Sequence, residues 1–436
     1  MGMTAREIGA ILAGCSLMIL VASIDNWFTF GVKRLMKVTF VEEYNMRIIA
    51  TCMPIGTLVG TVIFGLSCEL TGRKITLLAT TVTYVTSIVI FHLAKSVAVV
   101  SIGQVIAGLS VGGVLVALPI YIGETSEESC RGLLITLMGI FYYIGSIVFR
   151  MIGAYAAYTA YTAASITFAV CFAVLFLFVA RESPFYYTKR HKTHLDESEE
   201  VDKLTQIELK YVQESKTPNY LPTGWIKSIL IMLLLTVLYN LSGVYLVHYL
   251  VFYIYEYFKN EDVDLQIDTI LIISFLLQLL GCIICALLID RLGRKFCLMA
   301  SMIGLALFLA PVAIFSAVTE HYNYVVPIPA LNITFVIAHL VLLNVGLAPV
   351  QHIFLGELFS LKVKTAAVAV FVSMQRVSGF FMQFYLYPEF VQALGSSTVS
   401  LFLFMGSMIV GSVAVYFVLI ETKQKSLEEI QVALRK

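Results

Sequence analysis

The sequence has few charged residues. Only 13% of its 436 residues are Asp, Glu, Lys or Arg, while 59% are hydrophobic, and the mean hydropathy is +0.89. Soluble proteins carry about 25% charged residues. This composition therefore excludes an ordinary soluble enzyme and indicates a chain that lies mostly in a lipid bilayer. The net charge of +1 gives no electrostatic support for a nucleic-acid partner.

Several kinds of functional site are also lacking. We find no nucleophilic triad, no phosphate-binding glycine loop and no cluster of metal ligands, so we expect no enzyme activity, no cofactor and no metal. Cys282 and Cys285 form a C-x-x-C motif inside an apolar run, but there is no second pair, which argues against zinc. The eight cysteines lie in apolar runs or short loops, a pattern typical of reduced thiols.

What the sequence has in quantity is long apolar segments. A helix needs about 20 apolar residues to cross the hydrocarbon core of a bilayer, and twelve segments are long enough. Their ranges are 8–31, 48–67, 75–94, 97–121, 133–155, 162–180, 226–249, 267–289, 296–318, 330–354, 365–386 and 397–420. Most Lys and Arg residues lie in the loops on one side. By the positive-inside rule, that side and both termini are expected in the cytosol. The plasma membrane is our default location for this multi-pass protein.

A polar segment divides the twelve spans into two sets of six. We predict an N-terminal bundle at 1–181, a cytosolic linker with short helices at 182–224, a C-terminal bundle at 225–422 and a cytosolic tail at 423–436. Charged residues recur at equivalent points of the two halves, after the second and eighth spans, after the fourth and tenth, and at the ends of the sixth and twelfth. They are Glu69, Arg73, Glu124, Arg131 and Glu182 in the first half, and Asp290, Arg294, Glu357, Lys364 and Glu421 in the second. Duplicated helical halves are typical of carriers that work by alternating access.

These charges belong to longer motifs. Examples are Pro119-Ile-Tyr-Ile-Gly-Glu124, Glu182-Ser-Pro184, Asp290-x-x-Gly-Arg294-Lys295 and Glu357-Leu-Phe-Ser360. In their order and spacing they resemble the motifs of the sugar porter family of the major facilitator superfamily, which includes glucose facilitators and insect facilitated trehalose transporters. The resemblance covers nearly the whole chain. It implies an all-α membrane protein with twelve transmembrane helices in two pseudo-symmetric six-helix bundles, the major facilitator fold.

The resemblance also implies a role for the ten charges, a cytosolic latch that holds the outward-facing form. Ion pairs that are half desolvated at a seam between two rigid bundles are stronger than exposed ones. If they form in one state and separate in the other, they bias a two-state equilibrium. The alternative interpretation is that these residues only set topology and cap helices.

A sugar site needs many side-chain hydrogen bonds and an aromatic surface. The resemblance places such a site on the seventh, eighth, tenth and eleventh spans, where this chain departs from the usual glutamine, asparagine and tryptophan residues of the family. The candidate residues are Tyr239, Asn240, Tyr245, Gln278, Gln351, His352, Gln375 and Arg376. The family's glutamine in the fifth span is Gly139 here. The pocket therefore stays polar but is not the standard hexose pocket, and each candidate side chain could equally bond to another helix.

Three ionisable residues lie inside spans: Asp25, Arg150 and Arg376. Intramembrane charge is expensive and points to function. Asp25 aligns with an acid that proton-coupled family members use, but the arginine that partners this acid is Gln104 here. We predict that Arg150, at similar depth, pairs with Asp25, either for transport or as a purely structural pair. For Arg376 we consider either a bond to a backbone carbonyl or a site for anionic solutes.

Together these features predict a monomeric carrier, in the lipid bilayer, for a sugar or sugar-like small polar solute. A paired Asp25 would keep its charge, which favours facilitative uniport. Two alternatives remain open: a proton-coupled sugar symporter, and a transport-deficient, transporter-like sensor with an eroded substrate pocket.

Overall fold

The structure is a computed structural model, described here for residues 5–38, 43–183, 186, 223–244, 264–322, 329–359, 363–382, 397–425 and 427–435. The named elements in these segments are all α-helices. Ten helical stretches of the described chain are long and apolar enough to cross a membrane, and Trp225–Asn240 is a shorter apolar helix. The expectation of an all-helical membrane protein is confirmed.

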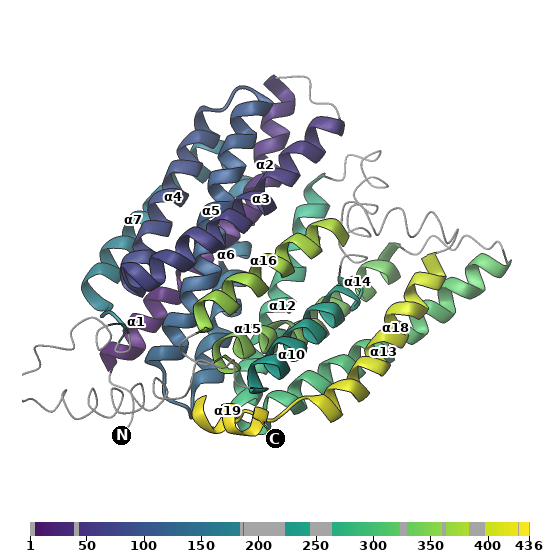
Figure 1. The fold of residues 1–436 in the computed structure, drawn as a ribbon. Helices are drawn as coiled ribbons and strands as arrows, with labels where there is room; N and C mark the ends of the chain where they lie inside the picture. The colour runs from purple at the N-terminus through teal and green to yellow at the C-terminus, as the bar shows by residue number, and fades with distance from the viewer. Residues whose placement is uncertain are drawn as a thin grey trace, which may run out of the picture.

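The helices form two groups, coloured purple to blue and teal to yellow in Figure 1. The first group comprises α1 (Ala5–Cys15), α2 (Leu17–Val38), α3 (Glu43–Leu70), α4 (Arg73–Leu93), α5 (Val97–Thr125), α6 (Arg131–Tyr155) and α7 (Tyr158–Val179). The second comprises α10 (Thr223–Asn240), α12 (Asp264–Leu292), α13 (Arg294–Tyr322), α14 (Pro329–Val345), α15 (Leu347–Glu357), α16 (Lys364–Phe381), α18 (Ser397–Val418) and α19 (Leu427–Arg435).

Each predicted span contains a helix, but two spans are broken. The first is divided into α1 and α2 at Ser16, and the tenth into α14 and α15 at Gly346. A Cβ atom at Gly346 would lie 2.2 Å from the carbonyl oxygen of Cys297 on α13. The chain therefore needs glycine here, because α13 approaches the backbone too closely for any side chain.

The two bundles meet along two seams, α6 with α12 and α3 with α16. These helices are the fifth and eighth spans and the second and eleventh spans. Since the second span corresponds to the eighth in the repeat, and the fifth to the eleventh, the two seams are equivalent. The pairing is therefore what a pseudo-two-fold relation between the halves requires.

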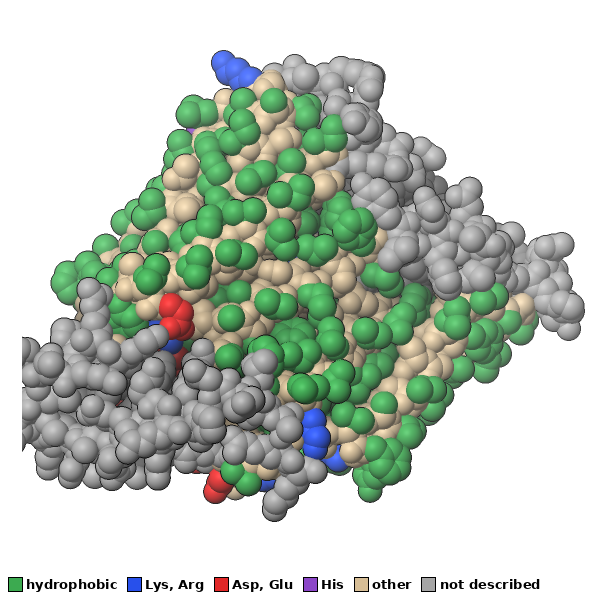
Figure 2. All heavy atoms as spheres, viewed as in Figure 1, with side chains coloured by type: hydrophobic (Ala, Val, Ile, Leu, Met, Phe, Trp, Pro, Cys, Tyr) green, Lys and Arg blue, Asp and Glu red, His purple; other side chains and the backbone are tan. Residues whose placement is uncertain are grey.

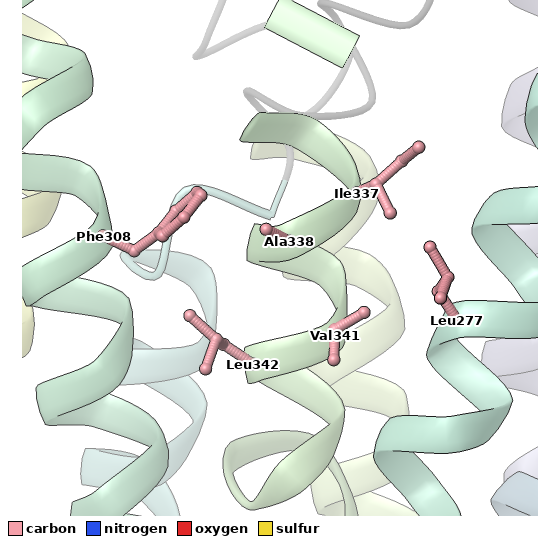
Figure 3. A pocket seen from close by; sticks show the side chains of 6 residues that line it. All are labelled: Leu277, Phe308, Ile337, Ala338, Val341 and Leu342. Carbon is pink, nitrogen blue, oxygen red and sulfur yellow. The ribbon is translucent and has the colours of Figure 1, made fainter. Parts of the chain in front are cut away.

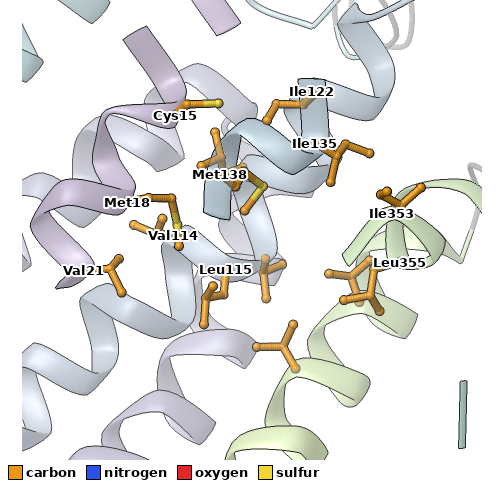
Figure 4. Close-up of a cluster of buried hydrophobic side chains, with 14 of the residues drawn as sticks. Cys15, Met18, Val21, Val114, Leu115, Ile122, Ile135, Met138, Ile353 and Leu355 are labelled. Atoms are coloured by element: carbon orange, nitrogen blue, oxygen red, sulfur yellow. The ribbon is translucent and has the colours of Figure 1, made fainter. Parts of the chain in front are cut away.

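Close packing holds each bundle together, while its outer surface is apolar. On α3, a Cβ at Gly56 would lie 2.1 Å from the carbonyl oxygen of Val105 on α5, so these helices touch backbone to backbone. Figure 4 shows buried side chains from α1, α2, α5 and α6 on one side and from α15 on the other. Apolar side chains cover the visible outer face in Figure 2; Phe178 and Phe417, for example, are 75% and 78% exposed. Such a surface suits lipid.

The predicted linker at 182–224 lies mostly outside the described residues. The predicted tail contains α19, whose Ile430 and Leu434 are buried. The side-chain amide of Gln431 donates to the carbonyl oxygen of Leu358, 2.7 Å away. This helix therefore closes the end of the second bundle.

Candidate functional site

Charged side chains gather at one end of the first bundle, around Arg73. This residue begins α4, and its Nη2 lies 3.0 Å from Oε1 of Glu124 and 3.7 Å from Oε1 of Glu69. Arg73 and Glu124 are 1% and 2% exposed at their side chains. The Ser183 hydroxyl donates to the other oxygen of Glu124 at 2.5 Å. Charge-assisted bonds of this kind fix the ends of α3, α4 and α5 relative to one another.

Glu182 caps α4 in the same cluster. Its Oε1 accepts hydrogen bonds from the backbone amides of Arg73 at 2.7 Å and Lys74 at 3.2 Å. A carboxylate is favourable there, because the first amides of a helix lack partners within the helix and carry its positive dipole end.

The second bundle repeats this arrangement around Arg294. Its Nη2 lies 3.0 Å from Oε1 of Glu357, and its Nη1 lies 2.8 Å from Oδ1 of Asp290. Glu421 accepts from the backbone amides of Arg294 and Lys295, both at 3.1 Å. We call the end of the molecule that carries both clusters the charged face. Eight of the ten predicted charges thus lie in two equivalent networks.

Among the described residues, two hydrogen bonds join the bundles at the charged face. Oδ2 of Asp290 accepts from the backbone amide of Leu133 at 2.7 Å, at the start of α6. Oε1 of Glu69 accepts from the Thr365 hydroxyl at 2.6 Å, at the start of α16. Each acid therefore serves both its own arginine and the opposite bundle.

The remaining two charges, Arg131 and Lys364, are buried at this junction, 6% and 1% exposed. Nζ of Lys364 makes no hydrogen bond within the described part of the chain. It lies 3.0 Å from the Cβ position of Gly123, across the boundary between the bundles. Lys364 precedes the predicted span at 365–386. The pKa of Lys364 is lowered to about 8, mainly by burial and also by the charges of Arg131 and Arg73, while Glu124 and Glu357 oppose the shift.

The predicted pocket amides bond to one another inside the second bundle. Nε2 of Gln375 donates to Oε1 of Gln351 at 2.9 Å, and Nε2 of Gln351 donates to the carbonyl oxygen of Leu235 at 2.6 Å. Nδ2 of Asn240 donates to Oγ of Ser378 at 3.1 Å. These bonds connect α10, α15 and α16, so part of the polarity that the sequence shows serves interhelical bonding.

A second polar group crosses between the bundles and includes two residues that sequence reasoning missed. The Tyr143 hydroxyl on α6 donates to Oδ1 of Asn344 on α14 at 2.8 Å. Nδ2 of Asn344 lies 3.5 Å from Oε1 of the predicted residue Gln278. Tyr143 follows the altered position Gly139 by one helical turn, and a Cβ atom at Gly139 would lie 3.1 Å from Sγ of Cys282. The four-residue spacing from Gly139 places Tyr143 on the same face of α6, and this could have identified Tyr143 from the sequence.

The predicted pair of Asp25 and Arg150 is wrong. Nη2 of Arg150 lies 2.5 Å from Oδ1 of Asp268 on α12. Asp25 instead accepts a hydrogen bond from the Tyr142 hydroxyl at 2.8 Å. Arg150 on α6 pairs with α12 of the second bundle rather than with α2 of its own bundle. Depth in the membrane does not determine the direction of a side chain around its helix.

The cation within electrostatic range of Asp25 is Arg376, from the opposite bundle. The charge of Arg376 also interacts electrostatically with Tyr239 and His352. Nδ1 of His352 lies 3.1 Å from the carbonyl oxygen of Ala348. Most of the predicted pocket residues are thus linked by bonds or charge near the bundle boundary. Tyr245, the other predicted pocket residue, lies outside the described residues.

A cavity of about 580 Å3 lies among α12, α13 and α14 (Figure 3). Its lining is entirely apolar and comprises Leu277, Phe308, Ile337, Ala338, Val341 and Leu342. It contains none of the predicted pocket residues and offers no side-chain hydrogen bonds, so it does not have the chemistry of a sugar site.

Comparisons with known proteins agree with this geometry. The model of the family described as "Sugar (and other) transporter" matches residues 17–434. The facilitated trehalose transporter Tret1 of Culex quinquefasciatus is 28% identical over 396 residues, which cover 87% of this chain and 75% of that protein. Tret1 of Apis mellifera ligustica is 27% identical over 413 residues, 90% of this chain and 80% of the relative. The structure of the proton:xylose symporter XylE bound to 6-bromo-6-deoxy-D-glucose superposes with a TM-score of 0.79 at 19% identity, covering 98% of both chains.

Proposed function

The chain belongs to the sugar (and other) transporter family, and on that premise we propose that it carries a sugar or sugar-like polar solute across a membrane by alternating access. The observation that carries the proposal is the doubled network around Arg73 and Arg294. Each network braces one bundle internally, while only Leu133–Asp290 and Glu69–Thr365 hydrogen bonds join the bundles at that face in the described chain. Rigid bundles with few polar bonds between them can rock as bodies.

We propose that the charged face lies in the cytosol, because most loop Lys and Arg residues are on that side. The first bundle would then extend over 1–181 and the second over 225–422, in a monomer at the plasma membrane. Hydrogen bonds join the bundles at this face, so with this orientation the cytosolic entrance would be closed. The ten charges would act as the latch of that entrance, and topology or capping alone does not account for bonds between bundles.

The solute would lie beside the groups that meet across the bundle boundary, next to the Tyr143–Asn344 bond and to the charges of Asp25 and Arg376. Carboxylate and guanidinium together give a site with no net charge, and a sugar hydroxyl can donate to one and accept from the other. A neutral polyhydroxylated solute therefore fits better than an anion. The carboxylate of Asp25 argues against the interpretation of Arg376 as an anion site.

We favour facilitative uniport. The relatives at 27–28% identity are named as facilitated trehalose transporters, whereas the proton symporter is 19% identical. The sequence argument for uniport, that pairing with Arg150 keeps Asp25 charged, no longer applies because Arg150 pairs with Asp268. Proton-coupled symport remains the second candidate, favoured by the half-buried carboxylate of Asp25 inside a span. A sensor that has lost transport is disfavoured by the complete latch, which a protein that does not cycle has little need of.

The test is uptake of radiolabelled trehalose, glucose and xylose into cells that lack their own sugar carriers, with and without an imposed proton gradient. We expect saturable uptake of at least one sugar that stops at equal concentrations and is unchanged by collapse of the gradient. Accumulation that collapses with the gradient, and that Asp25→Asn abolishes, would establish symport. Absence of uptake for every sugar, with the protein folded at the surface, would contradict the carrier function.

A further inference from the structure

The ion pair between Arg150 and Asp268 joins the two bundles at the end opposite the charged face. Arg150 lies near the end of α6, and Asp268 lies near the start of α12. Their side chains are 6% and 15% exposed, and Nη2 of Arg150 lies 2.5 Å from Oδ1 of Asp268. A pair this well shielded from water interacts more strongly than an exposed pair.

A third helix supports the arginine. The guanidinium carbon of Arg150 lies 4.9 Å from the centre of the Phe30 ring on α2, within the range of a cation–π contact. The Phe30 ring in turn fills the space beside Gly153, where a Cβ atom would lie 2.3 Å from it. The side chain of Arg150 is thus directed at α12 by its own bundle, which makes the pair a built contact rather than a chance approach of long side chains.

The same pair of helices carries the Leu133–Asp290 hydrogen bond at the charged face. Between the two ends, the Cβ position of Gly139 lies 3.1 Å from Sγ of Cys282. The α6–α12 seam is therefore closed at its middle and fastened by a polar contact at each end. Two bundles that rock about a central site must release one end while the other stays closed.

We propose that Arg150 and Asp268 are the outer gate of this carrier, an ionic clamp that must break before the solute path opens to the outside. Opening the outer end loses this short, charge-assisted bond, so the clamp favours states with the outer end closed. The proposal rests on the carrier function above and adds residues that control its cycle. The clamp opposes the latch of the charged face, and their balance sets which side the empty carrier faces.

The test uses Cys282, which is 2% exposed, as a reporter of outer opening in a variant whose other cysteines are alanine. A membrane-impermeant thiol reagent is applied to intact cells and to inside-out vesicles, and the rate of labelling is measured from each side. Arg150→Gln and Asp268→Asn should each raise the rate from outside about tenfold, the change that about 1.4 kcal/mol produces, and lower it from the inside. Lys95→Gln removes an exposed lysine at the same end and should leave both rates within about twofold.

Two further variants separate gating from structural damage. The double variant Arg150→Gln/Asp268→Asn should label no faster than either single variant, because both remove the same bond. The exchanged pair Arg150→Asp/Asp268→Arg should restore slow labelling from outside. Unchanged outer labelling in both single variants, or equal increases from both sides, would overturn the clamp. Labelling of Cys282 does not require a solute, so it tests the clamp independently of transport. If the variants label as predicted but no sugar is taken up, the carrier function is contradicted and the clamp is not.

Discussion

Arg73 and Arg294 occupy the same place in the two halves of the protein: each directs Nη2 at a buried glutamate oxygen 3.0 Å away, on Glu124 and Glu357 respectively. Each arginine also begins a helix whose first amides are capped by a second glutamate, Glu182 or Glu421. Two copies of one network, each using four helix ends, show that the charges define the geometry of the bundles at that face as well as their topology.

Replacement of either arginine should therefore damage both stability and transport. Arg294→Gln leaves the carboxylate of Glu357 buried without its cation, which costs about 3–5 kcal/mol when one partner of a buried pair is removed. We expect a lower Tm of the purified protein and loss of uptake, and the same for Arg73→Gln.

The neighbouring Lys295→Gln is the matched control for Arg294. Nζ of Lys295 makes an exposed hydrogen bond to the Tyr416 carbonyl, so its loss should cost less than about 1 kcal/mol. Arg294→Lys should rescue poorly, because Arg294 uses separate nitrogens for Glu357 and Asp290. A wild-type Tm in both Arg73→Gln and Arg294→Gln would show that the networks do not brace the bundles.

The latch residues were predictable from sequence because their positions depend on short covalent spacings. Arg73 follows Glu69 by four residues across a tight turn at Gly72, and Arg294 follows Asp290 by four across the matching turn at Gly293. The short connection between consecutive helices keeps each pair close. The twelve spans were predictable for a similar reason, since their length is determined by the bilayer. The breaks at Ser16 and Gly346 were not, because the one at Gly346 depends on the approach of another helix.

The partner of Arg150 could not be read from the sequence. Rise along a helix gives only an expected depth for a residue, and by that measure either Asp25 or Asp268 could have been the partner. The choice between them depends on the rotation of α6 and on which helix of the other bundle faces it. The same limit applies to Asn344, whose role depends on the hydroxyl of Tyr143 arriving from the opposite bundle.

Neutralising Asp25 should change which solutes compete for the site. In Asp25→Asn the charge of Arg376 loses its counter-charge, and an opposite charge about 8–16 Å away contributes about 1–2 kcal/mol at an effective dielectric constant of 20. We expect gluconate to inhibit sugar uptake about tenfold more strongly in Asp25→Asn than in the wild type. The comparison uses inhibition constants measured with glucose and gluconate.

Arg376 supplies the control for that experiment. Adding Arg376→Gln to Asp25→Asn removes the unbalanced cation, so the gain in gluconate inhibition should disappear. If gluconate inhibits wild type and Asp25→Asn equally, the two charges do not balance each other at the solute site.

The Tyr143–Asn344 bond should matter for the solute more than for stability. Tyr143→Phe removes one hydroxyl between the bundles, and a single neutral hydrogen bond contributes about 0.5–1.5 kcal/mol. We expect KM for uptake to rise about fivefold with little change in Tm. Tyr155→Phe, on the same helix but 58% exposed, should leave KM unchanged. A fall in Tm with no change in KM would instead indicate that the bond is purely structural.

The closed charged face should become more favourable as pH rises through 8. In this structure burial holds the pKa of Lys364 at about 8, whereas a lysine open to water has a pKa near 10.4. Between these values the open face binds one more proton than the closed face, so alkaline pH favours closure by about tenfold between pH 7 and pH 9. The labelling rate of the single Cys282 from the charged face of inside-out vesicles is divided at each pH by the rate for the denatured protein, because thiol ionisation alone speeds the reaction as pH rises. This ratio should fall accordingly. Lys364→Met cannot titrate and should remove this dependence. The charged groups that face Lys364 are Glu124, Glu357, Arg73 and Arg131. A dependence that survives in Lys364→Met would assign the titration to another group.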